Sequence, residues 1–262
     1  ILKKGDEVIV SEMEHHSNLV PWQMCCDYSQ ATLKVIPITN SGELDMSFFK
    51  KELSGKTKLV ALTHISNSLG TINPIEEIIE LTHQTDAKIL VDGAQAAAHA
   101  KLDVQKLDVD FYCFSAHKLY GPTGVGVLYG KEELLNMLPP YQGGGEMIKD
   151  VSIHKTTYAE LPHKFEAGTP NIAGVIAFKK AIDFIEEMPL TAVGKIFRPT
   201  LRQKIAEEVV EQSLKSLNIN VSVTSAIEKK RGLIVSIVTT DSADKEKIAE
   251  ALKPYTFNTN IS

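Results

Sequence analysis

The stretch Lys88-Ile-Leu-Val-Asp-Gly-Ala-Gln95 decides the fold, because it joins a buried strand to a helical pattern through one acidic residue. Its strand is apolar on both faces, which is typical of a strand buried between two layers of helices. Such runs alternate with helical patterns through the first two thirds of the chain. The expected strands are 7–11, 33–38, 58–64, 88–92, 111–115 and 126–129, and the expected helices lie near 17–29, 45–53, 74–85 and 94–100. This order predicts an α/β fold with a mostly parallel sheet between helices, whose ligands bind beyond the carboxyl ends of the strands.

The composition is that of an ordinary globular protein. The 262 residues are 43% hydrophobic and 23% charged, which excludes disordered, collagen-like and disulfide-scaffold classes. The net charge of -5 gives no general reason to bind nucleic acid or an anionic membrane, so any phosphate site must be local. Because the chain has three cysteines and no apolar run of about 20 residues, we expect a cytoplasmic protein that binds neither nucleic acid nor membrane.

The charge balance changes near residue 188. Residues 188–262 hold 11 basic and 8 acidic side chains, whereas all eight histidines, all three cysteines and the single tryptophan precede them. The residue patterns predict a small α+β unit, with helices at 201–217 and 242–252 and strands at 220–223 and 232–238. We therefore divide the chain into an incomplete large domain, residues 1–187, and a small unit, residues 188–262.

The stretch Phe114-Ser-Ala-His-Lys-Leu-Tyr-Gly-Pro-Thr-Gly-Val-Gly126 carries a lysine where a strand ends and a glycine-rich loop begins. A desolvated Lys118 amine is nucleophilic and can form a Schiff base with a carbonyl cofactor. Ser115 and His117 flank it closely enough to donate to a phosphate or to share a proton. For this stretch alone, a surface loop with an exposed lysine is the alternative.

Asp92 ends an apolar strand, and Gln95 follows three residues later. A carboxylate at the end of a buried strand needs a cationic partner or hydrogen-bond donors. The protonated nitrogen of a pyridinium ring is such a partner, and an aspartate that holds it keeps pyridoxal phosphate acting as an electron sink. The alternative is that Asp92 caps the helix that follows.

A histidine pair, His15 and His16, lies just past the first predicted strand. An imidazole can lie flat on an aromatic cofactor and exchanges protons at physiological pH. A zinc site does not fit the spacing, because adjacent histidines point to different sides and no third ligand is near in sequence. We therefore predict no metal site, and a purely structural histidine pair is the alternative to a cofactor contact.

Several segments in register share a pattern with one enzyme group. They are Glu14–Trp22 (EHHSNLVPW), Thr63–Gly70 (THISNSLG), Val91–Gln95 (VDGAQ), Ser115–Gly124 (SAHKLYGPTG), Gly143–Met147 (GGGEM) and Phe165–Asn171 (FEAGTPN). In this order they resemble the cysteine desulfurases of the SufS type, which belong to the class V aminotransferase group of pyridoxal-phosphate enzymes. Over residues 1–187, the resemblance implies the large domain of the fold type I architecture, truncated, and pyridoxal 5'-phosphate as cofactor.

The resemblance also implies roles for single residues around that cofactor. Lys118 would form the Schiff base, and His15 would stack on the pyridine ring; these two are the candidate catalytic residues. Asp92 would pair with the ring nitrogen, and Gln95 would donate a hydrogen bond to the phenolic oxygen.

Other implied roles concern the phosphate, the substrate and a second subunit. Ser115 and His117 would bind the phosphate, Asn67 would contact substrate, and Thr169 would reach the phosphate site of the neighbouring subunit of a homodimer. In this family, sulfur is taken from L-cysteine, alanine is left, and a persulfide passes toward iron-sulfur cluster assembly. Selenocysteine is the alternative substrate, and a sulfur-acceptor protein is an expected partner.

Two parts of the family pattern are missing from the sequence. The glycine and threonine turn that helps hold the phosphate would precede Ile1, and the small domain with a nucleophilic cysteine and a carboxylate-binding arginine does not follow residue 187. Cys25, Cys26 and Cys113 match none of that motif. Without a thiolate to accept sulfur, we expect a partial chain that is inactive in sulfur abstraction.

The segment Met188–Arg198 (MPLTAVGKIFR), together with Lys230–Leu233 and Tyr255–Phe257, looks like the last part of the carboxyl-terminal domain of acyl-CoA synthetases. In that family the lysine at the position of Lys195 stabilises charge on an acyl phosphate. A basic turn before an amphipathic helix is the alternative for this motif. Two further functions therefore stay open for the chain, part of an adenylate-forming ligase and a non-catalytic fusion of two gene fragments.

Overall fold

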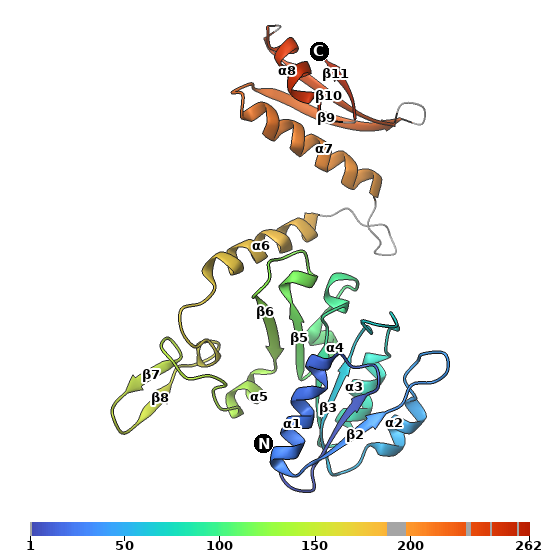
Figure 1. Ribbon diagram of the computed structural model, residues 1–262, viewed down its shortest axis with the longest axis vertical. Coiled ribbons are helices and arrows are strands. Elements are labelled where there is room, and N and C mark those ends of the chain that lie inside the picture. The colour runs from blue at the N-terminus through green and yellow to red at the C-terminus, as the bar shows by residue number, and fades with distance from the viewer. Residues whose placement is uncertain (1, 188–197, 229–231, 242, 256) are drawn as a thin grey trace. The chain divides into compact units, whose positions relative to one another are not determined.

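The computed structural model describes residues 2–187, 198–228, 232–241, 243–255 and 257–262 (Figure 1). The chain divides into two compact units, Ile1–Asp183 and Phe184–Ser262. Lys195 and the ligase-like segment around it lie outside the described residues, as does the predicted domain boundary. Both therefore stay predictions.

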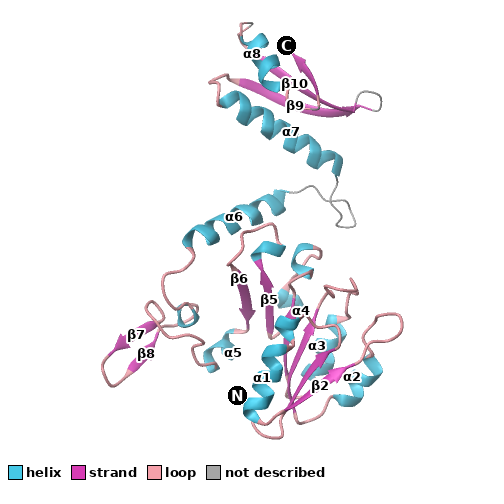
Figure 2. Ribbon diagram, in the orientation of Figure 1, coloured by secondary structure: helices cyan, strands magenta, loops and turns pink. Residues whose placement is uncertain are grey.

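A six-stranded sheet forms the centre of the first unit (Figures 1 and 2). The strands are β1 (Glu7–Ser11), β2 (Thr32–Ile36), β3 (Thr57–Thr63), β4 (Lys88–Asp92), β5 (Phe111–Ser115) and β6 (Gly126–Gly130). Their order is β2-β1-β3-β4-β5-β6; the first five are parallel, and β6 is antiparallel to β5. The prediction of a mostly parallel α/β sheet is confirmed.

Helices accompany this sheet (Figure 2). They are α1 (Val20–Ser29), α2 (Met46–Glu52), α3 (Ile75–His83), α4 (Val104–Leu107), α5 (Glu132–Met137) and α6 (Ile172–Glu187). Asp45 and Asp103 start α2 and α4 by accepting hydrogen bonds from backbone N–H groups three residues later, which satisfies donors that a helix start leaves open. Apolar side chains of α2 and α3 join those of the sheet in one buried cluster.

Two predicted elements differ from the structure. The helix expected near 94–100 is only a single 3-10 turn, Ala96–Ala98, whose start has no side-chain cap at Gln95, whereas Asp103 caps the new helix that follows it. The strand expected at 33–38 runs from Thr32 to Ile36, since Pro37 has no N–H to continue the ladder. The sequence patterns also missed α5, α6 and the hairpin of β7 (Ile148–Val151) and β8 (Thr156–Tyr158).

The register of the central strands brings their carboxyl ends into one row. Thr63 of β3 pairs with Asp92 of β4, and Asp92 pairs in turn with Cys113 of β5. Behind this row, the Tyr112 ring lies against the backbone of Gly93, where a Cβ atom would come within 1.9 Å of the ring. Only a glycine fits there without moving the tyrosine, so the turn after Asp92 is held by close packing.

The second unit is a three-stranded sheet with two helices (Figure 1). Its elements are α7 (Arg198–Lys215), β9 (Val221–Glu228), β10 (Gly232–Thr239), α8 (Asp244–Leu252) and β11 (Asn258–Ile261), in the strand order β11-β10-β9. Its buried cluster draws on α7, β10 and α8, with Val210, Leu214, Val235, Ile237 and Ile248 fully buried. The elements expected from the residue patterns are present, but the strand expected at 220–223 extends to Glu228, and β11 is an addition.

Candidate functional site

A pocket of about 360 Å³ opens at the carboxyl ends of β4 and β5. Its lining includes five of the residues predicted from sequence: His15, Asp92, Ser115, His117 and Lys118. They come from three separate stretches of chain, which the parallel order of β1, β3, β4 and β5 gathers at one edge of the sheet. The structure thus brings the predicted amine and carboxylate to the same small cavity.

Lys118 closes the 3-10 turn Ala116–Lys118 that follows β5 directly. The backbone N–H of Ala116 donates to Val125 across the loop, and the N–H of Gly121 donates back to Ala116, so both ends of the glycine-rich loop are tied to the start of this turn. The lysine side chain is half-buried. Within the described part of the chain, no acidic group pairs with its amine, which leaves the amine available to a ligand.

The Asp92 carboxylate is 8% exposed and lies in the same pocket. One oxygen, Oδ1, accepts a hydrogen bond of 2.9 Å from the backbone N–H of Ala94. Among the described residues, no donor contacts the other oxygen. The pKa of the neighbouring Cys113 thiol is raised to about 12, mainly by burial and in smaller part by the charge of Asp92. The Cys113 thiol is therefore neutral at physiological pH.

His15 caps the 3-10 turn His16–Asn18. Its Nδ1 accepts from the backbone N–H of Ser17 at 3.2 Å and lies 2.7 Å from the Ser17 hydroxyl. Because Nδ1 accepts the backbone N–H, the ring proton of neutral His15 sits on Nε2. The exposed ring is thereby held at the rim of the pocket.

Three predicted residues do not line the pocket. Gln95 and Asn67 contact one another, with the Gln95 amide donating to the Asn67 side-chain oxygen at 2.7 Å. Thr169 is exposed in the loop before α6. The structure therefore links Gln95 to Asn67 beside the pocket and leaves Thr169 apart from it.

Sequence reasoning missed a buried hydrogen-bond network around Glu14, the residue before His15. Glu14 is 8% exposed and accepts hydrogen bonds from the Ser11 hydroxyl, the Asn18 amide and the Thr63 backbone N–H. Burial raises the pKa of Glu14, the three donors lower it, and the nearby charge of Asp92 raises it; the net direction is up. The one signal in the sequence is an acidic residue directly before a histidine pair.

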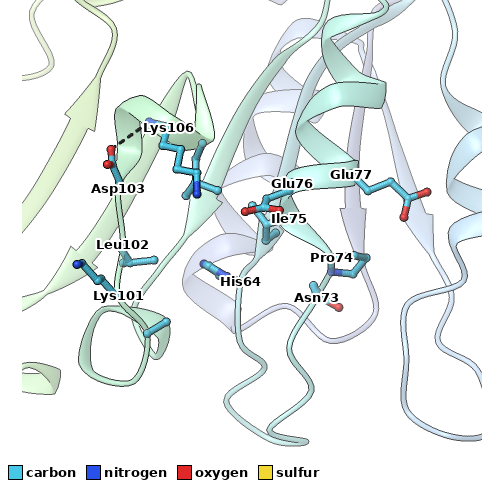
Figure 3. Close-up of a pocket in the computed structure, with 12 residues that line it drawn as sticks. His64, Asn73, Pro74, Ile75, Glu76, Glu77, Lys101, Leu102, Asp103 and Lys106 are labelled. Atoms are coloured by element: carbon cyan, nitrogen blue, oxygen red, sulfur yellow. Dashed lines mark hydrogen bonds between the residues drawn. The ribbon is translucent and has the colours of Figure 1, made fainter. Parts of the chain in front are cut away.

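A second, larger cavity of about 680 Å³ lies between the start of α3 and the segment 100–107 (Figure 3). His64 borders it, and its Nδ1 lies 3.1 Å from the Tyr112 hydroxyl. Burial lowers the pKa of His64, so this imidazole is neutral at physiological pH. The lining mixes Glu76, Asp103, Lys101 and Lys106, and it contains neither Asp92 nor Lys118.

Two kinds of feature are absent from the described ranges, a membrane-spanning helix and a metal cluster. None of the helices in the described ranges has the length and apolar character needed to cross a bilayer. In those same ranges, no three histidine, cysteine or acidic side chains gather as a metal site requires.

The sequence of the chain matches a known protein family. The sequence model of the aminotransferase class-V family matches residues 1–258. The chain belongs to that family. The family match includes most of residues 188–262, the segment with the ligase-like resemblance.

Individual members of the class-V family are also similar to this chain. A cysteine desulfurase of Enterobacter sp. is 52% identical over 204 residues, 78% of this chain and 50% of its own length. The solved structure of the cysteine desulfurase CsdA of Escherichia coli superposes with a TM-score of 0.71 at 38% identity and covers 86% of this chain and 54% of its own. A C-DES mutant with glycine covalently linked to its PLP cofactor shares the fold, with a TM-score of 0.65 at 24% identity over 98% of this chain and 67% of its own. The chain spans about half the length of the curated relatives it matches.

Proposed function

We propose that this class-V chain carries the pyridoxal phosphate site of a cysteine desulfurase, an enzyme that takes sulfur from L-cysteine and leaves alanine. The single observation that carries the proposal is that Asp92 and Lys118 line one pocket, each with a polar atom free of protein partners among the described residues. The similarity to cysteine desulfurases supports the choice of reaction.

The donor set of the pocket fits this cofactor. The free oxygen of the buried Asp92 carboxylate suits a protonated ring nitrogen, which needs an anion in a dry site. The His15 ring at the rim suits stacking on a flat ring, and the Lys118 amine suits a covalent bond to an aldehyde. The Ser115 hydroxyl and the His117 ring are donors that suit a phosphate.

Each of these residues then has a defined task. When bound, pyridoxal phosphate supplies an electron sink for bond breaking at the substrate Cα. Asp92 keeps the ring nitrogen protonated, His15 orients the ring, and Lys118 holds and moves the proton at its Nζ. We assign the Gln95 amide, which donates to Asn67, a second hydrogen bond to the ring oxygen, and we assign Asn67 a contact with the substrate.

Sulfur transfer needs a thiolate that this pocket does not supply. The Cys113 thiol is neutral, with its pKa raised to about 12, and Cys25 and Cys26 belong to α1, away from the pocket lining. We therefore propose that the chain binds cofactor and L-cysteine, or selenocysteine, but passes no sulfur to an acceptor protein unaided.

The proposal extends to assembly and location. We propose a homodimer, in which the exposed Thr169 reaches the phosphate site of the neighbouring subunit. The three cysteines are all free, which supports a reducing, cytoplasmic setting. Sedimentation of the purified chain at several concentrations tests the dimer, and a monomer at all of them contradicts it.

Borohydride trapping tests the cofactor site. The purified chain is incubated with pyridoxal phosphate, reduced with borohydride and digested, and the labelled peptide is identified by mass spectrometry. We expect the label on Lys118 and its loss in Lys118→Ala, with Lys101→Ala as the matched control because Lys101 borders the other cavity. Equal labelling of Lys118→Ala and the parent chain would refute the assignment.

Two further measurements separate binding from turnover. Pyridoxal phosphate should raise the melting temperature of the parent chain and not that of Asp92→Ala, because a ligand that binds only the folded state stabilises it. L-cysteine with the cofactor-loaded chain should release no sulfide. Sustained sulfide release would contradict the proposed lack of a thiolate acceptor.

A further inference from the structure

We propose that Glu14 is a positioning residue, which fixes His15 at the rim of the Asp92 pocket by anchoring the turn that follows it. Glu14 contacts three different parts of the chain, although it lies one residue before His15. Its Oε1 accepts from the Ser11 hydroxyl at 2.6 Å, at the end of β1, and from the Thr63 N–H at 3.1 Å, at the end of β3. Its Oε2 accepts from the Asn18 amide at 2.7 Å.

Asn18 passes this anchoring on to the histidine. It ends the 3-10 turn His16–Asn18, it is 5% exposed, and its backbone N–H donates to the His15 carbonyl at 2.8 Å. Between them, Ser17 donates to the His15 ring. The His15 ring is therefore bonded to a turn whose far end is fixed to two strands through Glu14.

The bonding pattern gives Asn18 only one orientation. Its Nδ2 donates to Glu14, and its Oδ1 accepts from the indole N–H of Trp22 at 3.0 Å. A flipped amide would point its NH₂ group at the indole N–H and its oxygen at the Glu14 carboxylate, and both contacts would be unfavourable. Glu14 and Trp22 thus lock the side chain that carries the turn.

This arrangement allows a selective substitution. In Glu14→Gln the amide oxygen can still accept from Ser11 and Thr63, but the NH₂ group then faces the Asn18 NH₂ group, and the Trp22 contact prevents Asn18 from turning over. Adding Asn18→Asp restores an acceptor for both the new amide and the indole, and it keeps the total charge of the pair. The double variant should therefore rebuild the anchor that the single variant breaks.

Hydrogen exchange of the unliganded full chain tests the anchor directly. The Ser17 amide reports the bond to the His15 ring. We expect its exchange to be about tenfold faster in Glu14→Gln and near the parent rate in Glu14→Gln/Asn18→Asp. Glu12→Gln is the matched control, because Glu12 is exposed just after β1 and its side chain accepts only from the Ile38 N–H among the described residues. Unchanged Ser17 exchange in Glu14→Gln would overturn the proposal.

The link to the pocket rests on the proposed function and needs a second measurement. We expect Glu14→Gln to weaken pyridoxal phosphate binding about tenfold in the parent chain and not to change it when His15→Ala is already present, since coupled residues are not additive. An equal loss in both backgrounds would show that Glu14 acts independently of His15.

If the parent chain binds no pyridoxal phosphate, the proposed function fails, and the Ser17 measurement still decides the anchor. If Glu14→Gln does not fold, a folded double variant with a protected Ser17 amide supports the anchor, and an unfolded one overturns it.

Discussion

The two compact units bury their sheets in different ways. In the first unit, strands such as β1 and β3 are buried over most of their length, so both faces are covered. In the second unit, β9 alternates between intermediate and exposed residues, which is typical of a sheet with one covered face. All the buried polar residues of the described chain, from Ser11 to Asp110, belong to the first unit.

This difference explains where the chemistry can lie. A strand with two covered faces has no solvent-facing side for polar residues, so they collect at its ends, where Asp92, Thr63 and Cys113 form a row. A sheet with one solvent-exposed face can place polar residues along the whole length of its strands, so these residues need not cluster at the strand ends. The first unit therefore has a polar pocket at its strand ends, whereas the buried residues of the second, among those described, are all apolar.

The largest expected effect concerns how far solvent is excluded from the strand ends at Thr63, Asp92 and Cys113. Because burial and Asp92 raise the pKa of Cys113 to about 12, its thiolate is scarce at pH 7.5, and alkylation by iodoacetamide should be about a thousandfold slower than at the exposed Cys25. The rate should rise with pH up to about 12 and increase in Asp92→Asn. Mass spectrometry of timed digests measures both rates, and equal labelling would show that water reaches the strand ends freely.

The second prediction asks whether the two units unfold separately. Leu214 is fully buried in the second unit, and Leu214→Ala should lower the free energy of unfolding of that unit by about 3 kcal/mol. Trp22, the single tryptophan, lies in the first unit, so its fluorescence midpoint in urea should not move while the circular dichroism transition does. Leu217→Ala, at a half-exposed site, is the control. A shift of the Trp22 midpoint would mean that the two units unfold as one.

A glycine substitution tests the tight packing of the first unit. Gly93→Ala should cost about 2 kcal/mol, because the new methyl group must displace the buried Tyr112 ring. Gly55→Ala has open space around it and serves as the matched control. Urea titration followed by Trp22 fluorescence measures both. Equal stability of the two variants would show that the Tyr112 ring moves aside freely.

The smallest effects concern ion pairs. Burial opposes the charge of Glu7, but the Ser54 hydroxyl and the Lys34 ammonium lower its pKa, and Glu7 in turn helps to raise that of Lys34. A lowered carboxyl pKa stabilises the fold above the unfolded value and loses this contribution as the pH falls through the folded value. Glu7→Gln should therefore cost about 1 kcal/mol at pH 7 and nothing near pH 2.

The exposed pair of Lys253 with Glu250 in the second unit provides the comparison. Glu250→Gln should have no measurable effect at either pH, because solvent screens an exposed pair. Urea titrations at both pH values test the two substitutions together. A pH-independent loss in Glu7→Gln would show that packing rather than charge accounts for it.

The strands of the first unit could be predicted because apolar runs bounded by polar residues carry their own signal. The short turn after Gln95 could not be predicted, since the run of alanines does not show that Gln95 leaves the start of a helix uncapped. The antiparallel direction of β6 could not be predicted either, because a short loop with Gly121 and Gly124 allows the next strand to run in either direction.

The site divides in the same way. The shared pocket of Lys118 and Asp92 could be predicted because Asp92 ends one strand, Lys118 follows the next, and parallel strands bring their ends together. The pairing of Gln95 with Asn67 and the network of Glu14 could not, because both need the strand order, which places β1 next to β3 and β3 next to β4. Thr169 rests on the family resemblance alone.

The reversed direction of β6 has a practical consequence. Since β5 and β6 form a hairpin, the whole connection from Ala116 to Val125 stays at one edge of the sheet and never crosses to the other. A protein engineer can therefore keep the turn Ala116–Lys118 and vary only the segment 119–125, which leads from that turn into the neighbouring strand β6. Libraries that vary its length would sample new ligand preferences while leaving the order of the parallel strands unchanged.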